Sequence, residues 1–591
     1  MKIALSFDRR IRLLILMGLL QGSLLFWMHK LLQYHVWPAT EPVWVVTWYT
    51  LALSIPLALQ LMVDHLSGSK AWRFAAGLAA LLFALSVYTG RAIFPEKGME
   101  PFEICGYFGL TVSILWYVSL PFAQTWLKTG RARFPYPDLF DYSWNNILTI
   151  ETAGVFAALF WGSLELWAGM FHILKIDFFK DLFHRTSFIY LVTGSVFGFA
   201  LSFGRSQKGL VTNLRATVLT IFRNLLPLPA FIGLIFLAAL PFTGLKPLWD
   251  TGHATLLMLN LQIYVILFLN AVYQDGGEEP PYHPLIRRLV EVGVIVLPAY
   301  ALLCAHATQL RIGQYGWSVN RVFGAVAVFV TGLYAAGYSW AALKRGSPWM
   351  RIISPVNVRI AVIVMALAVL LNTPVMDARL ITVRSQTTRL MKGKISAEKF
   401  DYDYVRFSLG KPGRDALVQL SKLQGHPKAE QIRSRASAAL AKKSRWAGPA
   451  GAQTVEEVAR QAKIYPQGKT LDPTFLPFLL ANKRKYGQYL TDDLRVLVLD
   501  LNGDDKEECV LLGGYFPPKR VFSLSAEGWK EIGSLTAVGN SGITDDELDK
   551  NLKTGDYRVI PPKWNLLQLG KKTFHLFEKT EGEGGNGPFI E

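Results

Sequence analysis

The sequence predicts a membrane all-α bundle of about 11 transmembrane helices, followed by a small α-helical linker region and a C-terminal, mostly-β extracytoplasmic domain. First, the chain of 591 residues is 51% hydrophobic and only 18% charged, with a positive mean hydropathy. That balance is typical of integral membrane proteins. Second, long apolar runs follow one another closely up to residue 376. Third, the hydrophobic period changes to that of short strands from about residue 490.

The predicted spans are apolar runs long enough to cross about 30 Å of hydrocarbon, which takes about 20 helical residues. We expect them at residues 11–29, 43–63, 72–93, 104–126, 147–171, 186–204, 219–243, 253–273, 288–309, 319–342 and 356–376. The first run has a basic start but no small-residue cleavage site after it, which indicates an uncleaved span. Pro227, Pro229 and Pro298 should kink or interrupt the seventh and ninth spans.

The orientation is predicted from Lys and Arg in the short loops, because cationic residues beside a span resist translocation. One set of alternate loops is rich in them: Arg9, Arg10, Lys70, Lys128, Arg131, Arg133, Arg205, Lys208, Arg215, Arg287, Arg288, Lys344, Arg345 and Arg351. The other set is poorer: Lys30, Lys97, Lys175, Lys180, Arg185, Lys246 and Arg311. We therefore expect a multi-pass protein of a bacterial inner membrane, with a cytoplasmic N-terminus and a periplasmic C-terminal domain. The net charge of +18 is thus topological and does not indicate nucleic-acid binding.

Ionisable residues inside the spans are candidates for function, because a charge in lipid is kept only if it is paired, protonated or in water. Glu165 falls well within the fifth span, and Glu151 precedes it by about four helical turns, on nearly the same face. The two carboxylates would line a proton or cation path, with Arg223 or Arg91 as counter-ion. Alternatively, Glu151 lies at the cytoplasmic boundary and Glu165 is a protonated packing residue.

Polar residues of the eighth span, Asn260 and Asn270, are expected to join helices by hydrogen bonds within the membrane. Residues 171–185, between the fifth and sixth spans, alternate apolar and charged side chains at near-helical spacing. This pattern predicts an amphipathic helix at the outer interface, either as a connector or as a guard of a substrate path.

The predicted domains are a transmembrane domain at 1–376, a helical juxtamembrane and linker region at 377–489, a β-rich extracytoplasmic domain at 490–578 and a disordered tail at 579–591. Only three cysteines occur, so the sequence predicts neither a disulfide framework nor a cysteine metal site.

The acidic stretch "DLNGDDKEE", residues 500–508, joins the first two predicted strands of that domain. Oxygen ligands at alternate positions are what a calcium loop requires. They would be the side chains of Asp500, Asn502, Asp504 and Glu508 and the carbonyl of Lys506. The stretch resembles the strand-loop-strand calcium sites of integrin-type β-propeller repeats, and the ion would act as a structural clip. A solvated hairpin turn is the alternative, because Asp505 stands where a calcium loop has Gly.

Several stretches resemble an uncharacterised family of polytopic bacterial inner-membrane proteins, the domain-of-unknown-function 4153 family. They are "IDFFKDLF", "ALPFTGLKPLWDTGHATLL", "LNAVYQDG", "QYGW", "SPVNVRIA" and "EKFDYDYVRFSLGKPGRDAL". The resemblance runs from about residue 140 to about residue 420. It implies a multi-span inner-membrane protein with a junction into an extracytoplasmic tail, and it implies no known activity.

Two classes of function fit these observations. The first is a transport, channel or flippase-like protein whose path involves Glu165 and the interrupted seventh or ninth span. The second is a cell-envelope sensor or assembly partner whose periplasmic domain binds a small molecule, calcium or a protein. A membrane-embedded transferase ranks third, because the sequence contains no phosphate loop, dinucleotide-binding turn, nucleophile elbow or zinc-protease helix.

Overall fold

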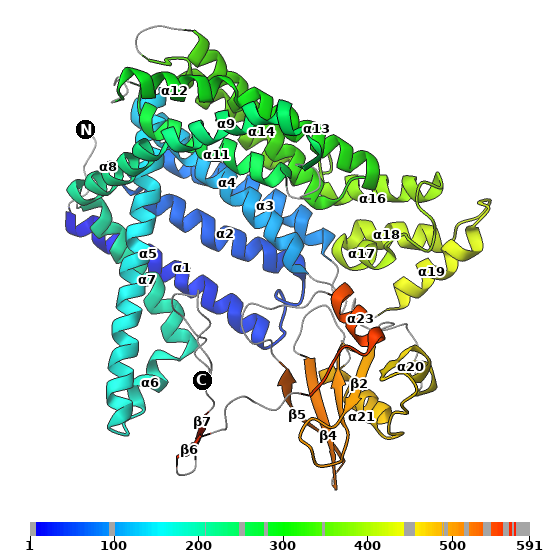
Figure 1. Ribbon diagram of the computed structural model, residues 1–591. Coiled ribbons are helices and arrows are strands. Elements are labelled where there is room, and N and C mark those ends of the chain that lie inside the picture. The colour runs from blue at the N-terminus through cyan, green and yellow to red at the C-terminus, as the bar shows by residue number, and fades with distance from the viewer. Residues whose placement is uncertain are drawn as a thin grey trace. The chain divides into compact units, whose positions relative to one another are not determined.

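The structure is a computed structural model that divides into two compact units, unit 1 (Met1–Leu440) and unit 2 (Ala441–Glu591), shown in Figure 1. It describes residues 7–93, 101–206, 208–247, 254–276, 282–344, 349–442, 455–486, 489, 494–512, 519–526, 528–535, 545–559, 567–569 and 572–574. The predicted disordered tail and the end of the predicted β domain, residues 575–591, lie outside this description.

Unit 1 is a helical bundle. Up to residue 371 its helices are α1 (Phe7–Gln33), α2 (Pro42–Leu61), α3 (Ser69–Ala92), α4 (Pro101–Thr129), α5 (Tyr136–Ile173), α6 (Phe178–Phe183), α7 (Thr186–Ser206), α8 (Lys208–Leu225), α9 (Pro227–Thr243), α11 (Ala254–Tyr273), α12 (Pro284–Ile295), α13 (Leu297–Tyr315), α14 (Val319–Leu343) and α15 (Ile353–Leu371). The described residues contain 11 segments long and apolar enough to span a membrane, and each coincides with one predicted span. The predicted bundle of about 11 membrane-spanning helices is thereby confirmed.

Two spans are interrupted, as the prolines predicted. The seventh span divides into α8 and α9 at Leu226, and the ninth divides into α12 and α13 at Val296. Pro227 is the first residue of α9, and Pro298 is the second residue of α13, where a missing backbone N–H costs a helix least.

The fifth span is longer than the sequence predicted, because α5 continues without a break over 38 residues. Figure 1 shows α5 and α7 side by side with α6 at their far end. The predicted amphipathic helix at 171–185 is reduced to the six residues of α6, since α5 takes its first residues and Lys175 turns the chain with φ +61°.

Four glycines bring α1 and α7 into backbone contact. A Cβ atom at Gly18 would lie 2.1 Å from the Gly194 carbonyl oxygen, and one at Gly22 would lie 2.3 Å from the Tyr190 carbonyl oxygen. The reciprocal positions on α7, Gly194 and Gly198, are equally tight. This is a small-residue crossing of the kind that holds membrane helices together by close packing.

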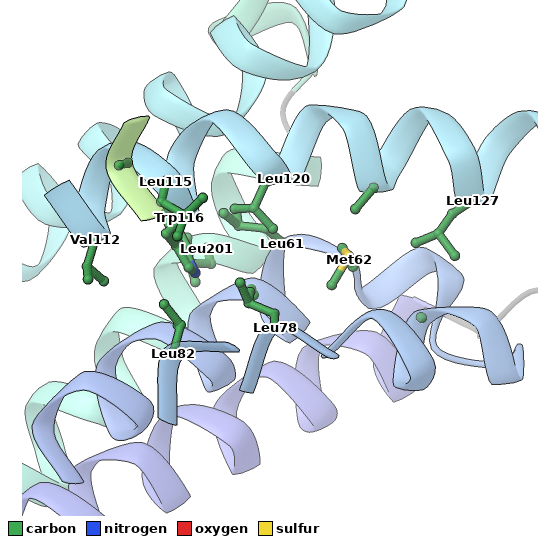
Figure 2. Close-up of a cluster of buried hydrophobic side chains, with 14 of the residues drawn as sticks. Leu61, Met62, Leu78, Leu82, Val112, Leu115, Trp116, Leu120, Leu127 and Leu201 are labelled. Carbon is green, nitrogen blue, oxygen red and sulfur yellow. The ribbon is translucent and has the colours of Figure 1, made fainter. Parts of the chain in front are cut away.

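Two apolar clusters hold the bundle together. The first lies among α2, α3, α4, α5 and α7, and Figure 2 shows Leu61, Leu82 and Leu120 within it. The second lies among α11, α12 and α14 and includes Val294 and Ala335. The end of α15 packs into the first cluster and its start into the second. The helices α4 and α5 meet the helices α11–α14 along a boundary that α15 bridges. We call this boundary the seam.

Beyond α15, unit 1 ends in four shorter helices, α16 (Ala378–Met391), α17 (Tyr402–Ser408), α18 (Gly410–Ser421) and α19 (Ala429–Ala441), packed around a third cluster. Asp377 caps α16 by accepting a hydrogen bond from the backbone N–H of Arg379, and its carboxylate also binds the Arg379 guanidinium at 2.8 Å and the Tyr88 hydroxyl at 2.7 Å. This buried group ties α16 to the end of α3.

Unit 2 is built on a five-stranded sheet in the order β1-β2-β3-β4-β5. The strands are β1 (Lys463–Tyr465), β2 (Arg495–Leu499), β3 (Glu508–Leu511), β4 (Lys519–Ser525) and β5 (Gly528–Leu535). β1 is parallel to β2 and the other pairs are antiparallel. The unit also contains α20 (Val455–Gln461), α21 (Phe475–Ala481), α22 (Lys483–Tyr486), α23 (Asp545–Thr554) and the hairpin β6 (Leu567–Leu569) and β7 (Lys572–Phe574).

Side chains alternate across the central strands. Val496 and Val498 of β2 face a cluster that includes Phe475, whereas Leu497 faces a second cluster with Leu552 of α23. The sheet therefore has apolar side chains packed on both faces. The compact units divide the chain after Leu440, so residues that the sequence analysis gave to a helical linker, including β1, belong to the sheet unit.

Candidate functional site

The two glutamates expected within the fifth span lie on the exposed surface of α5. The Glu165 side chain is 52% exposed, and its Oε1 lies 3.7 Å from the Nε2 atom of His184. Glu151 is also exposed. In the part of the chain that the structure describes, neither glutamate forms an ion pair with Arg91 or Arg223. The structure does not bring the predicted carboxylates and cations together.

Two other polar candidates within the spans, Asn260 and Arg223, lie in different surroundings. Asn260 is exposed on α11. Arg223 lies on α8, where its backbone carbonyl accepts a hydrogen bond from the Tyr282 hydroxyl at 2.5 Å. The Nε atom of Arg223 is buried and has no hydrogen-bond partner among the described residues.

Asn270 lies at the centre of a polar cluster, which we call the clamp, with Tyr136, Tyr338 and Asn357. Its amide donates to the Tyr338 hydroxyl at 2.7 Å, and its carbonyl oxygen accepts from Asn357 at 2.7 Å and from Tyr136 at 3.3 Å. Tyr338 donates in turn to the Asn357 carbonyl oxygen at 2.5 Å. The clamp joins α5, α11, α14 and α15 across the seam, as interhelical amides do in membranes.

A larger polar feature lies on the other side of α5. It is a cavity of about 630 Å³, which we call the vestibule, and this volume is within the range of small-molecule sites. Its lining is contributed by Arg10, Ile11, Leu14, Val63, Asp64, Gln124, Tyr142, Asn145, Asn146, Thr149, Ser202, Gly204, Val211 and Thr212. Uncharged hydrogen-bonding side chains therefore outnumber charged ones in the vestibule.

The outer end of the vestibule reaches the surface, where the Arg10 guanidinium lies 2.9 Å from the Asp64 carboxylate and both side chains are more than a third exposed. At its inner end, Gln124 and Asn146 are buried and exchange two amide hydrogen bonds, at 3.0 and 2.8 Å. Gln124 also donates to the Leu61 carbonyl at 3.1 Å. These bonds satisfy the buried amides and fix their orientation.

The vestibule lies toward one end of the bundle. Apart from the α5 side chains, its lining comes from the start of α1, the chain just after α2, the last turns of α4 and α7 and the start of α8. These are the helix ends that the loop charges predict to be cytoplasmic. Beyond its inner end the first apolar cluster begins. Its members include Leu201, labelled in Figure 2, which directly precedes Ser202, and Ala153, one turn beyond Thr149. The arrangement is a polar recess that ends against a packed core.

The acidic loop of unit 2 is organised by its own carboxylates. Asp500 accepts hydrogen bonds from the backbone N–H groups of Gly503 at 2.7 Å and Asp505 at 3.0 Å, and these donors hold the pKa of Asp500 below its ordinary value. Asn502 accepts from Asp504 N–H, and Asp504 accepts from Lys506 N–H, both at 2.9 Å. The side-chain oxygens at alternate positions thus curl the backbone in successive turns.

Asp505 stands where a calcium loop has Gly. Its φ of +62° is the positive backbone angle that a calcium loop requires at this position. Glu508, by contrast, is buried in β3 and accepts hydrogen bonds from Leu501 N–H at 2.9 Å and the Ser523 hydroxyl at 3.3 Å. In the described ranges no three His, Cys, Asp or Glu side chains are grouped to hold a metal. Of the predicted calcium ligands, Glu508 is therefore held by hydrogen bonds within the sheet, and Asp500, Asn502, Asp504 and the Lys506 carbonyl remain candidates.

Sequence reasoning missed the vestibule and most of the clamp. Gln124 and Asn357 fall inside predicted spans, and a polar amide within an apolar run was a usable signal for both. Asn145 and Asn146 precede the predicted start of the fifth span, so they had the appearance of loop residues. Their place inside the bundle depends on the unexpected length of α5.

The fold defines a polytopic α-helical membrane protein with an additional β-sheet unit. A family model described as a domain of unknown function (DUF4153) matches residues 44–420. The chain belongs to this family, and the resemblance noted in the sequence is confirmed. Comparisons with curated proteins and with solved structures gave no match.

Proposed function

We propose that the protein is a transport or channel-like protein of a bacterial inner membrane, in which the vestibule admits a polar solute from the cytoplasm. Unit 2 would be an accessory periplasmic domain. The observation that carries this proposal is the polar cavity within the bundle, because burying so many amide and hydroxyl groups has a cost unless they meet a partner, water or a ligand.

The chemistry of the vestibule favours an uncharged, hydroxyl-bearing solute. Arg10 and Asp64 neutralise each other, and the other polar groups of the lining are amides and hydroxyls that both donate and accept hydrogen bonds. The packed core beyond Ser202 would have to open for the solute to cross, so in this proposal the described conformation would be a state open on one side.

The first experiment tests whether water fills the vestibule, and from which side. In a chain with Cys105, Cys304 and Cys509 replaced by Ser, Asn145→Cys should react with a membrane-impermeant maleimide in inside-out vesicles only. The control is Leu159→Cys on the same helix, which is 68% exposed on its apolar surface and should react in neither vesicle orientation. Labelling of Asn145→Cys from outside would reverse the topology, and no labelling at all would contradict a water-filled vestibule.

The second experiment tests permeation. Proteoliposomes should swell in glycerol, xylitol or glucose faster than protein-free liposomes. Asn146→Leu should reduce the swelling rate at least about tenfold, because it removes a side-chain amide that would hydrogen-bond to the solute in the vestibule. Asn260→Leu, an equivalent change on the exposed side of α11, should leave the rate unchanged. A folded Asn146→Leu variant with the wild-type swelling rate would exclude the vestibule as the path.

A second candidate is a cell-envelope sensor or assembly partner whose unit 2 binds calcium, another ligand or a protein. The specific observation in its favour is the loop at 500–508, where successive side-chain-to-backbone turns and the positive φ of Asp505 match what a calcium loop needs. Bound calcium would supply a structural clip between β2 and β3.

Calorimetric titration of the full chain with calcium tests this candidate. Wild type should bind, Asp504→Ala should lose binding, and the matched variant Asp505→Gly should retain it, because position 505 contributes only its backbone. Equal heats for wild type and Asp504→Ala would exclude the loop as a calcium site.

A further inference from the structure

A second cavity, of about 460 Å³, lies at the seam on the opposite side of α4–α5 from the vestibule. Tyr136, Asn270 and Asn357 of the clamp contribute its polar part. Its apolar walls include Phe122, Trp144 and Ala361. We call it the seam cavity.

The clamp residues lie at the shallow end of the seam cavity, and its wall extends deeper into the bundle. Tyr136 is the first residue of α5, and Asn270 and Asn357 lie within about one turn of the ends of α11 and α15, that is within about 6 Å of them. The wall continues up α4 through Val118 to Tyr117, whose hydroxyl is bonded to the Ser143 carbonyl and which lies about 18 Å from the end of that helix. Half of a bilayer's hydrocarbon is about 15 Å thick, so the cavity is about one leaflet deep.

The seam cavity is also electrically neutral. None of the residues that line it carries a formal charge, and the charged groups on the first turns of α5 are already paired, Asp138 with Lys128 and Asp141 with Arg215, both at 2.7 Å. A charged head group placed there would lose its hydration without gaining an opposite charge.

Hydrogen-bonding capacity remains for a neutral head group. Tyr136, Asn270 and Asn357 line the cavity at its shallow end, and the Asn357 carbonyl oxygen, which accepts one hydrogen bond from Tyr338, can accept a second. Tyr334 also lines the cavity, and its hydroxyl makes no hydrogen bond with any residue that the structure describes. An apolar pocket with a few convergent polar groups is the usual form of a small-molecule site.

We propose that the seam cavity binds a single-chain lipid with an uncharged, hydroxyl-bearing head group, of the monoacylglycerol class, from the leaflet next to the N-terminus. The chain lies along α4 and α5, and the head group meets the clamp. Because the clamp ties together α5, α11, α14 and α15, the lipid sits where the two clusters of the bundle join. This inference concerns a different cavity from the vestibule and does not rest on the proposed transport.

The test uses the purified full chain and a monooleoylglycerol analogue with a photoactivatable diazirine in its acyl chain. Cross-links should map to residues 117–122 and 139–147. Unlabelled monooleoylglycerol should compete, and ionised oleate, which has the same chain and a charged head, should compete at least about tenfold less well. Equal competition by oleate would overturn the uncharged head group, and cross-links spread over all lipid-facing helices would overturn the site.

Two variants locate the site further. Ala361→Phe fills the apolar part of the cavity and should reduce cross-linking at least about tenfold, a loss of about 1.4 kcal/mol of binding. Leu302→Phe, on a side chain of α13 that is 71% exposed, should leave cross-linking unchanged. Undiminished cross-linking of Ala361→Phe would also overturn the proposal. If this variant does not fold, the competition experiment with the wild-type chain still tests the site.

Discussion

The crossing of α1 and α7 allows a stability prediction whose size follows from the structure. In Gly18→Ala, the new Cβ would lie 2.1 Å from the Gly194 carbonyl oxygen, whereas real Cβ atoms essentially never approach closer than 3.0 Å. The two backbones must therefore separate locally by about 1 Å, which in a packed core costs about 1–3 kcal/mol.

The matched control is Gly162→Ala on α5, where a Cβ would meet nothing within 4 Å. Both substitutions gain the same helix propensity, about 1 kcal/mol for Ala over Gly. The difference between the two variants therefore isolates the contact between α1 and α7. It should appear as a melting temperature about 2–6 °C lower for Gly18→Ala than for Gly162→Ala in detergent.

A double variant sharpens this test. Gly18 and Gly194 each face the carbonyl of the other, so one separation of the helices accommodates both new methyl groups. The destabilisation of Gly18→Ala/Gly194→Ala should thus be clearly smaller than the sum of the single effects. The close crossing is contradicted if Gly18→Ala and Gly162→Ala have the same melting temperature. It is also contradicted if the destabilisation of the double variant equals the sum of the two single effects.

Three further predictions concern single side chains. Burial on its own would raise the pKa of Asp377, but the Arg379 guanidinium and the Tyr88 hydroxyl outweigh it and hold the pKa below its ordinary value. The ionised Asp377 therefore stabilises the fold above about pH 4, and this stability is lost as pH falls through the folded-state pKa. Thermal unfolding of Asp377→Asn should accordingly depend less on pH between about 7 and 3 than that of wild type, and an unchanged pH profile would contradict this. Asn146→Leu strands the Gln124 amide and should lower the free energy of unfolding by about 1–3 kcal/mol, with part of the loss recovered in Gln124→Leu/Asn146→Leu. Glu165→Gln should leave proteoliposome swelling unchanged, because Glu165 lies about 24 Å along α5 from Thr149, the deepest α5 residue of the vestibule lining. A loss of swelling would indicate that Glu165 does line the solute path.

The sequence determined the features that depend on length and local order. Each of the predicted spans coincides with an apolar helical segment, because the hydrophobic length needed to cross a membrane is a property of the segment alone. Pro227 and Pro298 marked the interruptions of two spans, since a missing N–H acts within one turn. The strand-rich part of unit 2 was recognisable from the change of period at about residue 490, whereas β1 precedes that boundary and was assigned to the helical linker.

Only the tertiary structure decided which side chains meet. Glu165 was the natural candidate within a span, and the packing of α5 leaves it half exposed at a distance from both cavities. Asn146 had the appearance of a loop residue, and the same helix carries it into a buried amide pair with Gln124. Helical periodicity fixes which residues share a face, but which face turns toward a neighbouring helix is set by contacts between distant segments, such as the glycines of α1 and α7.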